Sequence, residues 1–362
     1  MRLIYTSAEY IRNDLPGVEK KIQDQLLALK ESGVVIERTD VKKKPHLMRA
    51  IPFSSTLSWN RLAIPNADCQ YIRMEPFSFP FICYLRKCRR QAPRTHILVE
   101  LPTYPYDTEI KRLNIITQIR DRFYRRYLYK YVNRIVTFTD DREIFGIKTI
   151  GIQNGIDVQS VPVAKGRTPD GEIHLIAVAA LQKYHGYERI LEGLHLYYSG
   201  GGERTVRFLI VGSGYAEDEL QKMTKEYKIE NYVEFLGPRK GSALTEAYNL
   251  ADIGVGSFGL YKRKDSVSSA LKTREYLARG LPVISGCIED VFRNKEVDFY
   301  LEFDNNERPV DIQQVVTFYD RLFSEGKESL SGRVREFALR NVDVRSTFKP
   351  VVDYIMGTGE RL

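Results

Sequence analysis

Short apolar segments suited to buried strands alternate with segments of helical periodicity along the whole chain. Strand-like runs occupy residues 3–6, 34–39, 71–73, 97–101, 135–138 and 149–152 in the first half, and 173–179, 206–211, 233–236, 253–255 and 283–285 in the second. Because strands separated by helices pair in parallel, this alternation predicts an α/β fold with helices on both faces of each sheet. A length of 362 residues is enough for two such domains.

A linker-like segment separates the two sets of strands. Residues 158–171 contain Pro162, Gly166, Pro169 and Gly171, a composition typical of a connection between domains. We therefore predict two Rossmann-like domains joined by one hinge.

A long helix is predicted over residues 110–133. Its apolar positions fall on one stripe at helical spacing, formed by Ile115, Ile119, Phe123, Tyr127 and Tyr131.

The excess positive charge lies in the first half of the chain. Residues 1–163 contain 27 Lys and Arg against 17 Asp and Glu, a balance of +10, whereas the remainder contains 28 against 30, a balance of −2. The cations cluster at 42–44, 86–90 and 120–130. A basic half suits nucleic acid, anionic lipid or phosphorylated substrates, and each cluster is equally consistent with a solvated helix face. The sequence contains no recognisable nucleic-acid-binding module, so we expect no nucleic-acid partner.

The remaining composition predicts a cytoplasmic protein without a structural metal. The four cysteines, Cys69, Cys83, Cys88 and Cys287, lack the paired spacing of a zinc site and are expected to be reduced thiols. No apolar run reaches the length of a membrane span, and the first residues lack the pattern of a signal peptide.

Two glycine motifs follow predicted strands or begin predicted helices. Gly212 and Gly214 form a turn in which backbone can approach a ligand, but Glu217 replaces the third glycine of a dinucleotide fingerprint, which argues against NAD. Gly17 begins the first long helix, where an N–H group can hold phosphate or sugar oxygens.

The stretch 256–284 is the densest in candidate residues. A Gly- and Ser-rich loop enters a helix near Ser269, whose free N–H groups are suited to phosphate. Glu275 lies about two turns further on, placed either to accept hydrogen bonds from a ribose diol or as a surface helix acid.

These motifs together resemble a known family. The segments 154–157, 211–214, 235–237 and 275–284 occur in the order and spacing of the retaining nucleotide-sugar transferases of glycosyltransferase family 4, which have the GT-B fold. Within it, residues 100–106, 183–189 and 271–277 resemble a branch from capsule and exopolysaccharide clusters.

The resemblance implies a GT-B architecture with two Rossmann-like domains facing a central cleft. It places the acceptor-binding domain at 1–160, the nucleotide-sugar-binding domain at 161–338 and a C-terminal helix, 339–362, packing back on the first domain. The implied activity is metal-independent hexosyl transfer, without a cofactor, from a UDP-, GDP- or dTDP-linked sugar to a saccharide acceptor linked to polyprenyl diphosphate. The basic clusters would then rest on the anionic inner face of the cell membrane.

The resemblance also implies roles for individual residues. We expect Glu275 to hold the ribose and Glu100 to orient or deprotonate the acceptor hydroxyl. The donor nucleotide sugar is expected to contact a further set of cations, serines and glycines, all but Gly212 and Gly214 of them at the diphosphate: Gly17, Lys183, His185, Gly212, Gly214, Ser268, Ser269 and Lys272. The expected catalytic residues are Glu100, Lys183 and Glu275.

The sequence departs from the family pattern at the positions of its usual charged residues. The Arg and Lys that grip the diphosphate fall at Ala180 and His185, and the first of two glutamates spaced eight apart is Val267. The acceptor-side histidine is replaced by Glu100. These departures leave open a non-catalytic accessory subunit, or another GT-B enzyme such as a nucleotide-sugar epimerase.

Overall fold

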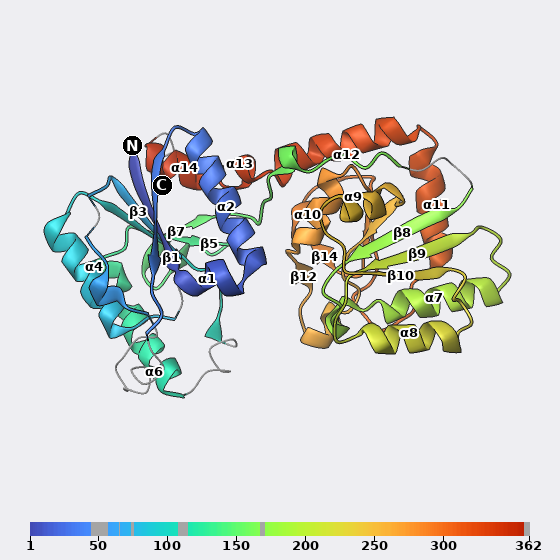
Figure 1. The fold of residues 1–362 in the computed structure, drawn as a ribbon, viewed down its shortest axis with the longest axis horizontal. Helices are drawn as coiled ribbons and strands as arrows, with labels where there is room; N and C mark the ends of the chain where they lie inside the picture. The colour runs from blue at the N-terminus through green and yellow to red at the C-terminus, as the bar shows by residue number, and fades with distance from the viewer. Residues whose placement is uncertain (45–56, 65, 74–75, 108–114, 167–170, 358–362) are drawn as a thin grey trace. The chain divides into compact units, whose positions relative to one another are not determined.

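The computed structural model describes residues 1–44, 57–64, 66–73, 76–107, 115–166 and 171–357, which form two compact units (Figure 1). Unit 1 comprises Met1–Gln153 and Thr347–Leu362, and unit 2 comprises Asn154–Ser346. The chain thus leaves unit 1 seven residues before the expected boundary at 160, and it returns to unit 1 at Thr347.

Unit 1 is built on a seven-stranded sheet in the order β2-β1-β3-β4-β5-β7-β6. Its strands are β1 Arg2–Ala8, β2 Val35–Val41, β3 Cys69–Arg73, β4 His96–Glu100, β5 Arg134–Thr137, β6 Glu143–Ile144 and β7 Ile147–Gly151. All pairs are parallel except β6 with β7. The helices are α1 Glu9–Asp14, α2 Pro16–Glu31, α4 Phe79–Gln91, α6 Ile115–Tyr124 and α14 Lys349–Met356.

Aromatic side chains fill the core of unit 1. Tyr5 on β1 stacks on Tyr71 on β3 with ring centroids 5.0 Å apart, and Phe348 packs on Tyr71 at 5.8 Å. Trp59 is buried against Phe81 of α4. The contact of Phe348 with Tyr71 joins the returning C-terminal segment to the central strands of this unit.

Unit 2 is built on a six-stranded parallel sheet in the order β10-β9-β8-β11-β13-β15. Its strands are β8 Ile173–Val178, β9 Val206–Val211, β10 Val233–Gly237, β11 Ile253–Val255, β13 Val283–Ser285 and β15 Tyr300–Glu302, and β12 Val267–Ser268 pairs separately with β14 Ile288–Glu289. The helices are α7 Glu188–Ser199, α8 Glu217–Glu226, α9 Gly241–Asn249, α10 Leu271–Ala278, α11 Ile312–Phe323, α12 Lys327–Asn341 and α13 Val344–Thr347. Helices α7 and α8 cover one face of the sheet, and α9, α10 and α12 the other (Figure 1).

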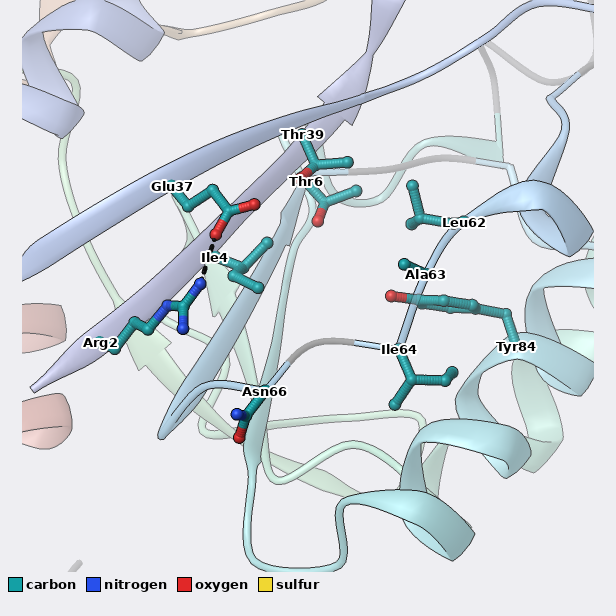
Figure 2. Close-up of a pocket in the computed structure, with 10 residues that line it drawn as sticks. All are labelled: Arg2, Ile4, Thr6, Glu37, Thr39, Leu62, Ala63, Ile64, Asn66 and Tyr84. Carbon is teal, nitrogen blue, oxygen red and sulfur yellow. Dashed lines mark hydrogen bonds and ion pairs between the residues drawn. The ribbon is translucent and has the colours of Figure 1, made fainter.

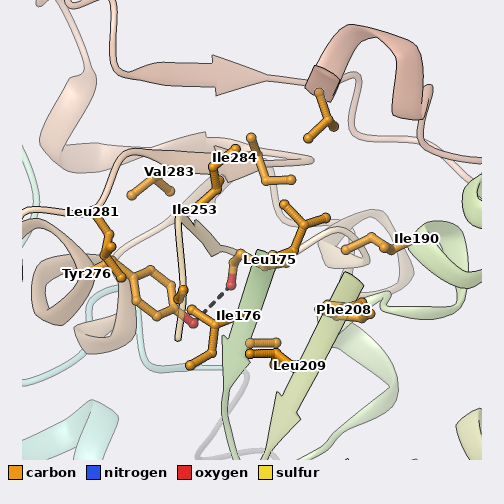
Figure 3. Close-up of a cluster of buried hydrophobic side chains, with 14 of the residues drawn as sticks. Leu175, Ile176, Ile190, Phe208, Leu209, Ile253, Tyr276, Leu281, Val283 and Ile284 are labelled. Atoms are coloured by element: carbon orange, nitrogen blue, oxygen red, sulfur yellow. Dashed lines mark hydrogen bonds between the residues drawn. The ribbon is translucent and has the colours of Figure 1, made fainter. Parts of the chain in front are cut away.

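The core of unit 2 follows from its apolar strands. Leu175, Phe208, Ile253 and Val283 come from four strands and are wholly buried together (Figure 3). Strands apolar at successive positions suit a parallel sheet covered on both faces. The predicted α/β class with parallel sheets and two Rossmann-like domains is confirmed.

The helix predicted over 110–133 ends earlier than expected. Residues 110–114 lie outside the described residues, α6 ends at Tyr124, and a 3₁₀ segment, Arg125–Lys130, follows. Ile115, Ile119 and Phe123 on the apolar stripe are exposed to solvent instead of covering a core.

Candidate functional site

Except for Gly17, the residues expected to bind the donor lie in unit 2, where the direction of strand addition reverses. From β8, the chain adds β9 and β10 on one side of the sheet and β11 and β13 on the other. Ligands of open α/β sheets bind at the carboxyl ends of strands around such a switch point. The loops that follow β8 and β11 meet here, since the Phe258 N–H donates to the His185 carbonyl at 2.7 Å.

A tyrosine braces this switch point from α10. The Tyr276 hydroxyl accepts from the Val178 N–H at 3.0 Å and donates to the Val255 carbonyl at 3.1 Å. Val178 and Val255 are the last residues of β8 and β11. A Cβ at Gly254 would lie 2.4 Å from the Tyr276 ring, so this glycine is needed to admit the ring. Helix α10 is thereby fixed against the strand ends.

The glycines of the turn after β9 are explained by backbone packing. A Cβ at Gly212, where φ is +125°, would lie 1.9 Å from the Ala179 carbonyl oxygen, and one at Gly214 would lie 2.4 Å from that of Leu181. The Leu181 N–H also donates to the Ser213 carbonyl at 2.9 Å. Both glycines therefore let this turn pack against the loop after β8, and their contact with a donor stays a prediction.

We predict that Gly212→Ala destabilises unit 2 by about 2–3 kcal/mol, because a methyl group there both overpacks the turn and requires a strained backbone. Gly237→Ala is the matched control: its φ is +64°, but no atom lies within 4 Å of the added Cβ, so about 1 kcal/mol is expected. Urea unfolding followed by circular dichroism measures both. Equal losses would contradict the packing role.

Lys183 and His185 lie in the short 3₁₀ segment after β8, and only Lys183 supplies a charge. The Lys183 side chain is 56% exposed and pairs with Glu219 at 3.0 Å, a contact that raises the lysine's pKa. His185 is buried, its Nδ1 lies 3.2 Å from the Gln182 N–H, and burial lowers its pKa to about 3. A neutral imidazole would contact the diphosphate only through hydrogen bonds, and this contact of His185 stays a prediction.

Lys272 reaches into the switch point from the first turn of α10. Its Nζ donates to the Gly256 carbonyl at 2.8 Å and to the Tyr187 hydroxyl at 3.1 Å. Burial lowers the pKa of Lys272 to about 8, an effect that the nearby Glu289 carboxylate partly offsets. The charge of Lys272 in turn helps to lower the pKa of His185. The resemblance expects a cation at the position of His185. Here a cation close to His185 is supplied instead by Lys272 of α10.

The two serines before α10 differ in what their side chains contact. Ser268 is buried in β12. The Ser269 hydroxyl donates to Asp290 at 2.8 Å and accepts from Asn154 at 2.9 Å. The wholly buried Arg274 donates to both oxygens of Asp290 at 2.6 and 2.7 Å. This network fixes the entry to α10 and engages the Ser269 hydroxyl, so a phosphate contact there falls to backbone N–H groups.

Glu275 lies one turn beyond Lys272 on α10. Its side chain is 30% exposed and accepts a hydrogen bond from Arg279 at 3.3 Å. The structure therefore brings Lys183, His185, Lys272 and Glu275 into unit 2 around the strand ends, with the ribose role of Glu275 remaining a prediction.

The two expected residues of unit 1 have different environments. Gly17 is exposed in the first turn of α2, with no atom within 4 Å of an added Cβ. Glu100 ends β4 and is wholly buried, and its carboxylate accepts hydrogen bonds from Tyr71 at 2.6 Å, from Gln25 at 3.1 Å and from Arg73. Both oxygens are engaged and neither is exposed, which argues against deprotonation of an acceptor, and the expected role of Glu100 in orienting or deprotonating the acceptor stays a prediction.

Three further residues of the unit 2 site were not selected from the sequence. The Tyr187 hydroxyl accepts a hydrogen bond from Lys272. Glu289 is a wholly buried carboxylate near Lys272. The Asn154 side chain donates to the Ser269 hydroxyl, 115 residues away in sequence. The sequence offered a signal for Asn154, whose Asn-Gly pair was interpreted as a turn. For Glu289, the signal was a carboxylate four residues after the apolar strand Val283–Ser285.

A separate cavity of about 250 Å³ lies in unit 1 (Figure 2). Alternate residues of β1 and β2 line one side, and an ion pair of 2.8 Å joins Arg2 to Glu37. The lining residues are Arg2, Ile4, Thr6, Glu37, Thr39, Leu62, Ala63, Ile64, Asn66 and Tyr84. None of the residues selected from the sequence is among them.

The part of the chain that the structure describes contains no group of three or more His, Cys, Asp or Glu side chains placed to hold a metal ion. Metal independence of the reaction stays a prediction.

Residues 172–309 match the family described as glycosyl transferases group 1. This segment of unit 2 is therefore similar to group 1 glycosyltransferase domains. It contains the loops after β8, β9 and β11 together with the start of α10, and hence all the donor-site residues just described in unit 2 except Asn154. No curated protein matches the chain.

Solved structures of glycosyltransferases share the fold over the whole chain. A glycosyltransferase from Rickettsia africae is 11% identical with a TM-score of 0.63, and 99% of each chain is covered. HepE from Anabaena, solved with UDP, is 12% identical with a TM-score of 0.60, covering 99% of this chain and 100% of that one. Sucrose-phosphate synthase from Thermosynechococcus elongatus has the same coverage, 13% identity and a TM-score of 0.62. The chain therefore has the GT-B fold.

Proposed function

We propose that this protein is a retaining glycosyltransferase that moves a hexosyl group from a nucleoside-diphosphate sugar to a saccharide acceptor linked to polyprenyl diphosphate, in the synthesis of a surface polysaccharide. The observation that carries the proposal is the position of Lys272 and Glu275, one turn apart at the switch point of a domain similar to group 1 glycosyltransferase domains. The UDP bound by HepE supports a nucleotide donor of this kind.

The cations of unit 2 would stabilise the leaving diphosphate. As the bond from the anomeric carbon to the diphosphate breaks, negative charge grows on the phosphate oxygens. Lys272 lies buried at the strand ends, where a charge acts more strongly than in water. Lys183 lies in the loop after β8 and is exposed, so it can leave Glu219 for a phosphate oxygen. Backbone N–H groups at the start of α10 add donors.

Glu275 would hold the ribose through its carboxylate, which is partly exposed. The acceptor hydroxyl forms the new bond to the anomeric carbon, and its proton passes to the leaving diphosphate, as the resemblance implies. We name no protein nucleophile. Glu100 enters this proposal as a positioning residue that holds Arg73 in unit 1.

Thermal unfolding with UDP, GDP, dTDP and CDP tests the proposal, with NAD and a short RNA as controls. A nucleotide at a hundredfold its dissociation constant adds about 2.7 kcal/mol to the stability of the binding unit. For a unit of this size, each kcal/mol shifts the melting temperature by about 2–4 °C. We expect one nucleoside diphosphate to produce a clear shift, and a shift with NAD or RNA alone would overturn the proposal.

A non-catalytic accessory subunit is the alternative that one observation favours. Val267, 42% exposed, stands where the resemblance expects a carboxylate on the donor sugar. An activity assay distinguishes the two, using nucleotide sugars that carry the base identified by thermal unfolding. Sugar transfer or donor hydrolysis would show that the protein is an enzyme. Binding of the nucleotide without turnover of any sugar form would favour the accessory role.

A further inference from the structure

Glu289 is a wholly buried carboxylate in unit 2, at the end of the short strand β14. Its backbone N–H donates to the Tyr300 hydroxyl at 3.3 Å, and its Oε1 accepts from the Ser285 hydroxyl at 3.2 Å. Burial of a carboxylate is strongly unfavourable unless other charges compensate for the lost water. One hydroxyl donor is too little for this, so a nearby cation is expected.

The cation is Lys272, which meets Glu289 at Gly256, the residue after β11. The Lys272 Nζ donates to the Gly256 carbonyl at 2.8 Å. A Cβ at Gly256 would lie only 2.9 Å from Oε1 of Glu289, so the carboxylate packs directly against this glycine. Three segments distant in sequence, at β11, α10 and β14, thus bring an ammonium group and a carboxylate to the same residue.

Five titratable neighbours of this pair are neutral near pH 7. They come from the loop after β8, from α10 and from β13 to β15, and are His185, Tyr187, Tyr276, Cys287 and Tyr300. Burial lowers the pKa of His185 to about 3 and raises that of Cys287 to about 12. Burial also raises the pKa of each of the three tyrosines. None of these five groups can therefore balance the charge of Lys272.

The charged neighbours already have partners of their own. Arg274 donates to both oxygens of Asp290, and Glu275 accepts from an arginine one turn further along α10. Burial raises the pKa of Glu289, but the charges of Lys272 and Arg274 oppose this rise and favour the ionised form. The Glu289 carboxylate in turn favours the ammonium form of Lys272. Each member of this buried pair thus favours the charged form of the other.

We propose that Glu289 is a positioning residue of the donor site, which keeps the Lys272 ammonium charged at the strand ends and touches no substrate itself. This inference rests on the proposed function, because the charge of Lys272 matters through the diphosphate that it would bind. A buried lysine without a carboxylate nearby loses its proton more easily. A carboxylate in contact with the diphosphate would repel it. Glu289 is closed to solvent against Gly256, so it can stabilise the cation without meeting the anion.

NMR of protein labelled with ¹³C at lysine Cε tests the electrostatic step without any nucleotide. Lys272→Met identifies the Lys272 signal, whose titration gives the pKa of this lysine directly. Glu289→Gln keeps the shape of the side chain and removes its charge. We expect the Lys272 midpoint, about pH 8 in wild type, to fall by at least about one pH unit in this variant. Glu289→Asp keeps a carboxylate on a shorter side chain and should lower the midpoint by less.

Calorimetric titration with the nucleoside diphosphate that shifts the melting temperature tests the effect on the donor site. At pH 8, Glu289→Gln should bind it at least about fivefold more weakly than wild type, because fewer molecules carry the ammonium group. At pH 6 the two proteins should agree within about twofold, since Lys272 is charged in both. A merely structural defect would weaken binding at both pH values. Glu302→Gln, which changes an exposed carboxylate at the end of β15, is the matched control and should alter neither measurement.

The proposal is overturned if the Lys272 midpoint is unchanged in the Glu289 variants that fold, which thermal unfolding without ligand identifies. It is also overturned if Glu289→Gln binds the nucleotide at pH 8 as wild type does. Failure of the proposed function gives a different result, in which no nucleoside diphosphate binds wild-type protein at any pH. The role at the donor site would then fall with it, while the NMR midpoint would still report the pairing of Glu289 with Lys272.

Discussion

Replacing Lys272 by methionine is expected to reduce sugar transfer, or donor hydrolysis, at least about 100-fold. Methionine keeps most of the volume and removes the Nζ that Gly256 and Tyr187 hold at the strand ends. His185 cannot compensate, because it is buried and neutral. The loss should appear in turnover more than in folding, which thermal unfolding without ligand checks.

The pH dependence of nucleotide binding follows from the same residue. With the pKa of Lys272 lowered to about 8, the ammonium group loses its proton as pH rises through that value. A diphosphate is held by the charged form, so the affinity for the preferred nucleoside diphosphate should be full below pH 8 and fall above it. Calorimetric titration across this range measures the change, and Lys272→Met should remove it.

Two control variants separate this effect from a general loss of charge. Lys183→Ala removes the exposed cation of the β8 loop and should lower turnover about tenfold, since charge in water acts more weakly. Lys222→Met removes a cation of α8 that is 77% exposed, and should change nothing. Wild-type turnover in Lys272→Met, or an unaltered pH profile, would show that the leaving diphosphate does not depend on this lysine.

The architecture of the chain could be predicted because it depends on local patterns. Runs such as 173–179 and 206–211 are apolar without alternation, and the glycines and prolines between elements mark where they end. These signals act over a few residues, and they led directly to parallel sheets in two units. Glu275 was likewise placed on its helix correctly, because its spacing to the helix start is local.

The charge state of the site could not be predicted because it depends on long-range packing. His185 has an ordinary sequence context, but the loops after β8 and β11 bury it and make it neutral. The orientation of α6 also depends on long-range packing. Its stripe indicates a helix with one apolar side, whereas the direction of that side is set by Asp121 bonding to Phe77, 44 residues away in sequence.

Glu100→Ala is expected to destabilise unit 1 by about 3–5 kcal/mol, because it leaves the buried Arg73 without its carboxylate. The Tyr71 hydroxyl and the Gln25 amide would also lose their acceptor. Trp59 is the single tryptophan of the chain and lies buried in unit 1, so urea unfolding followed by its fluorescence reports on this unit. Asp353→Ala, which removes the partner of Lys349 from a largely exposed pair, should cost less than about 1 kcal/mol.

A second pair of variants separates this structural role from a catalytic one. Replacing both members, Arg73→Met with Glu100→Leu, should recover most of the lost stability, since a buried ion pair replaced by apolar groups of similar volume is often neutral. Glu100→Gln keeps the shape and an acceptor for Tyr71, and its turnover per folded molecule should stay near that of wild type. If Glu100→Gln folded normally but lost transfer, the carboxylate would have to act on the acceptor after all, and unit 1 would have to open at β4 to expose it. Because Glu100 is wholly buried and paired with Arg73, we expect its charge to hold Arg73 in place instead of acting on the acceptor.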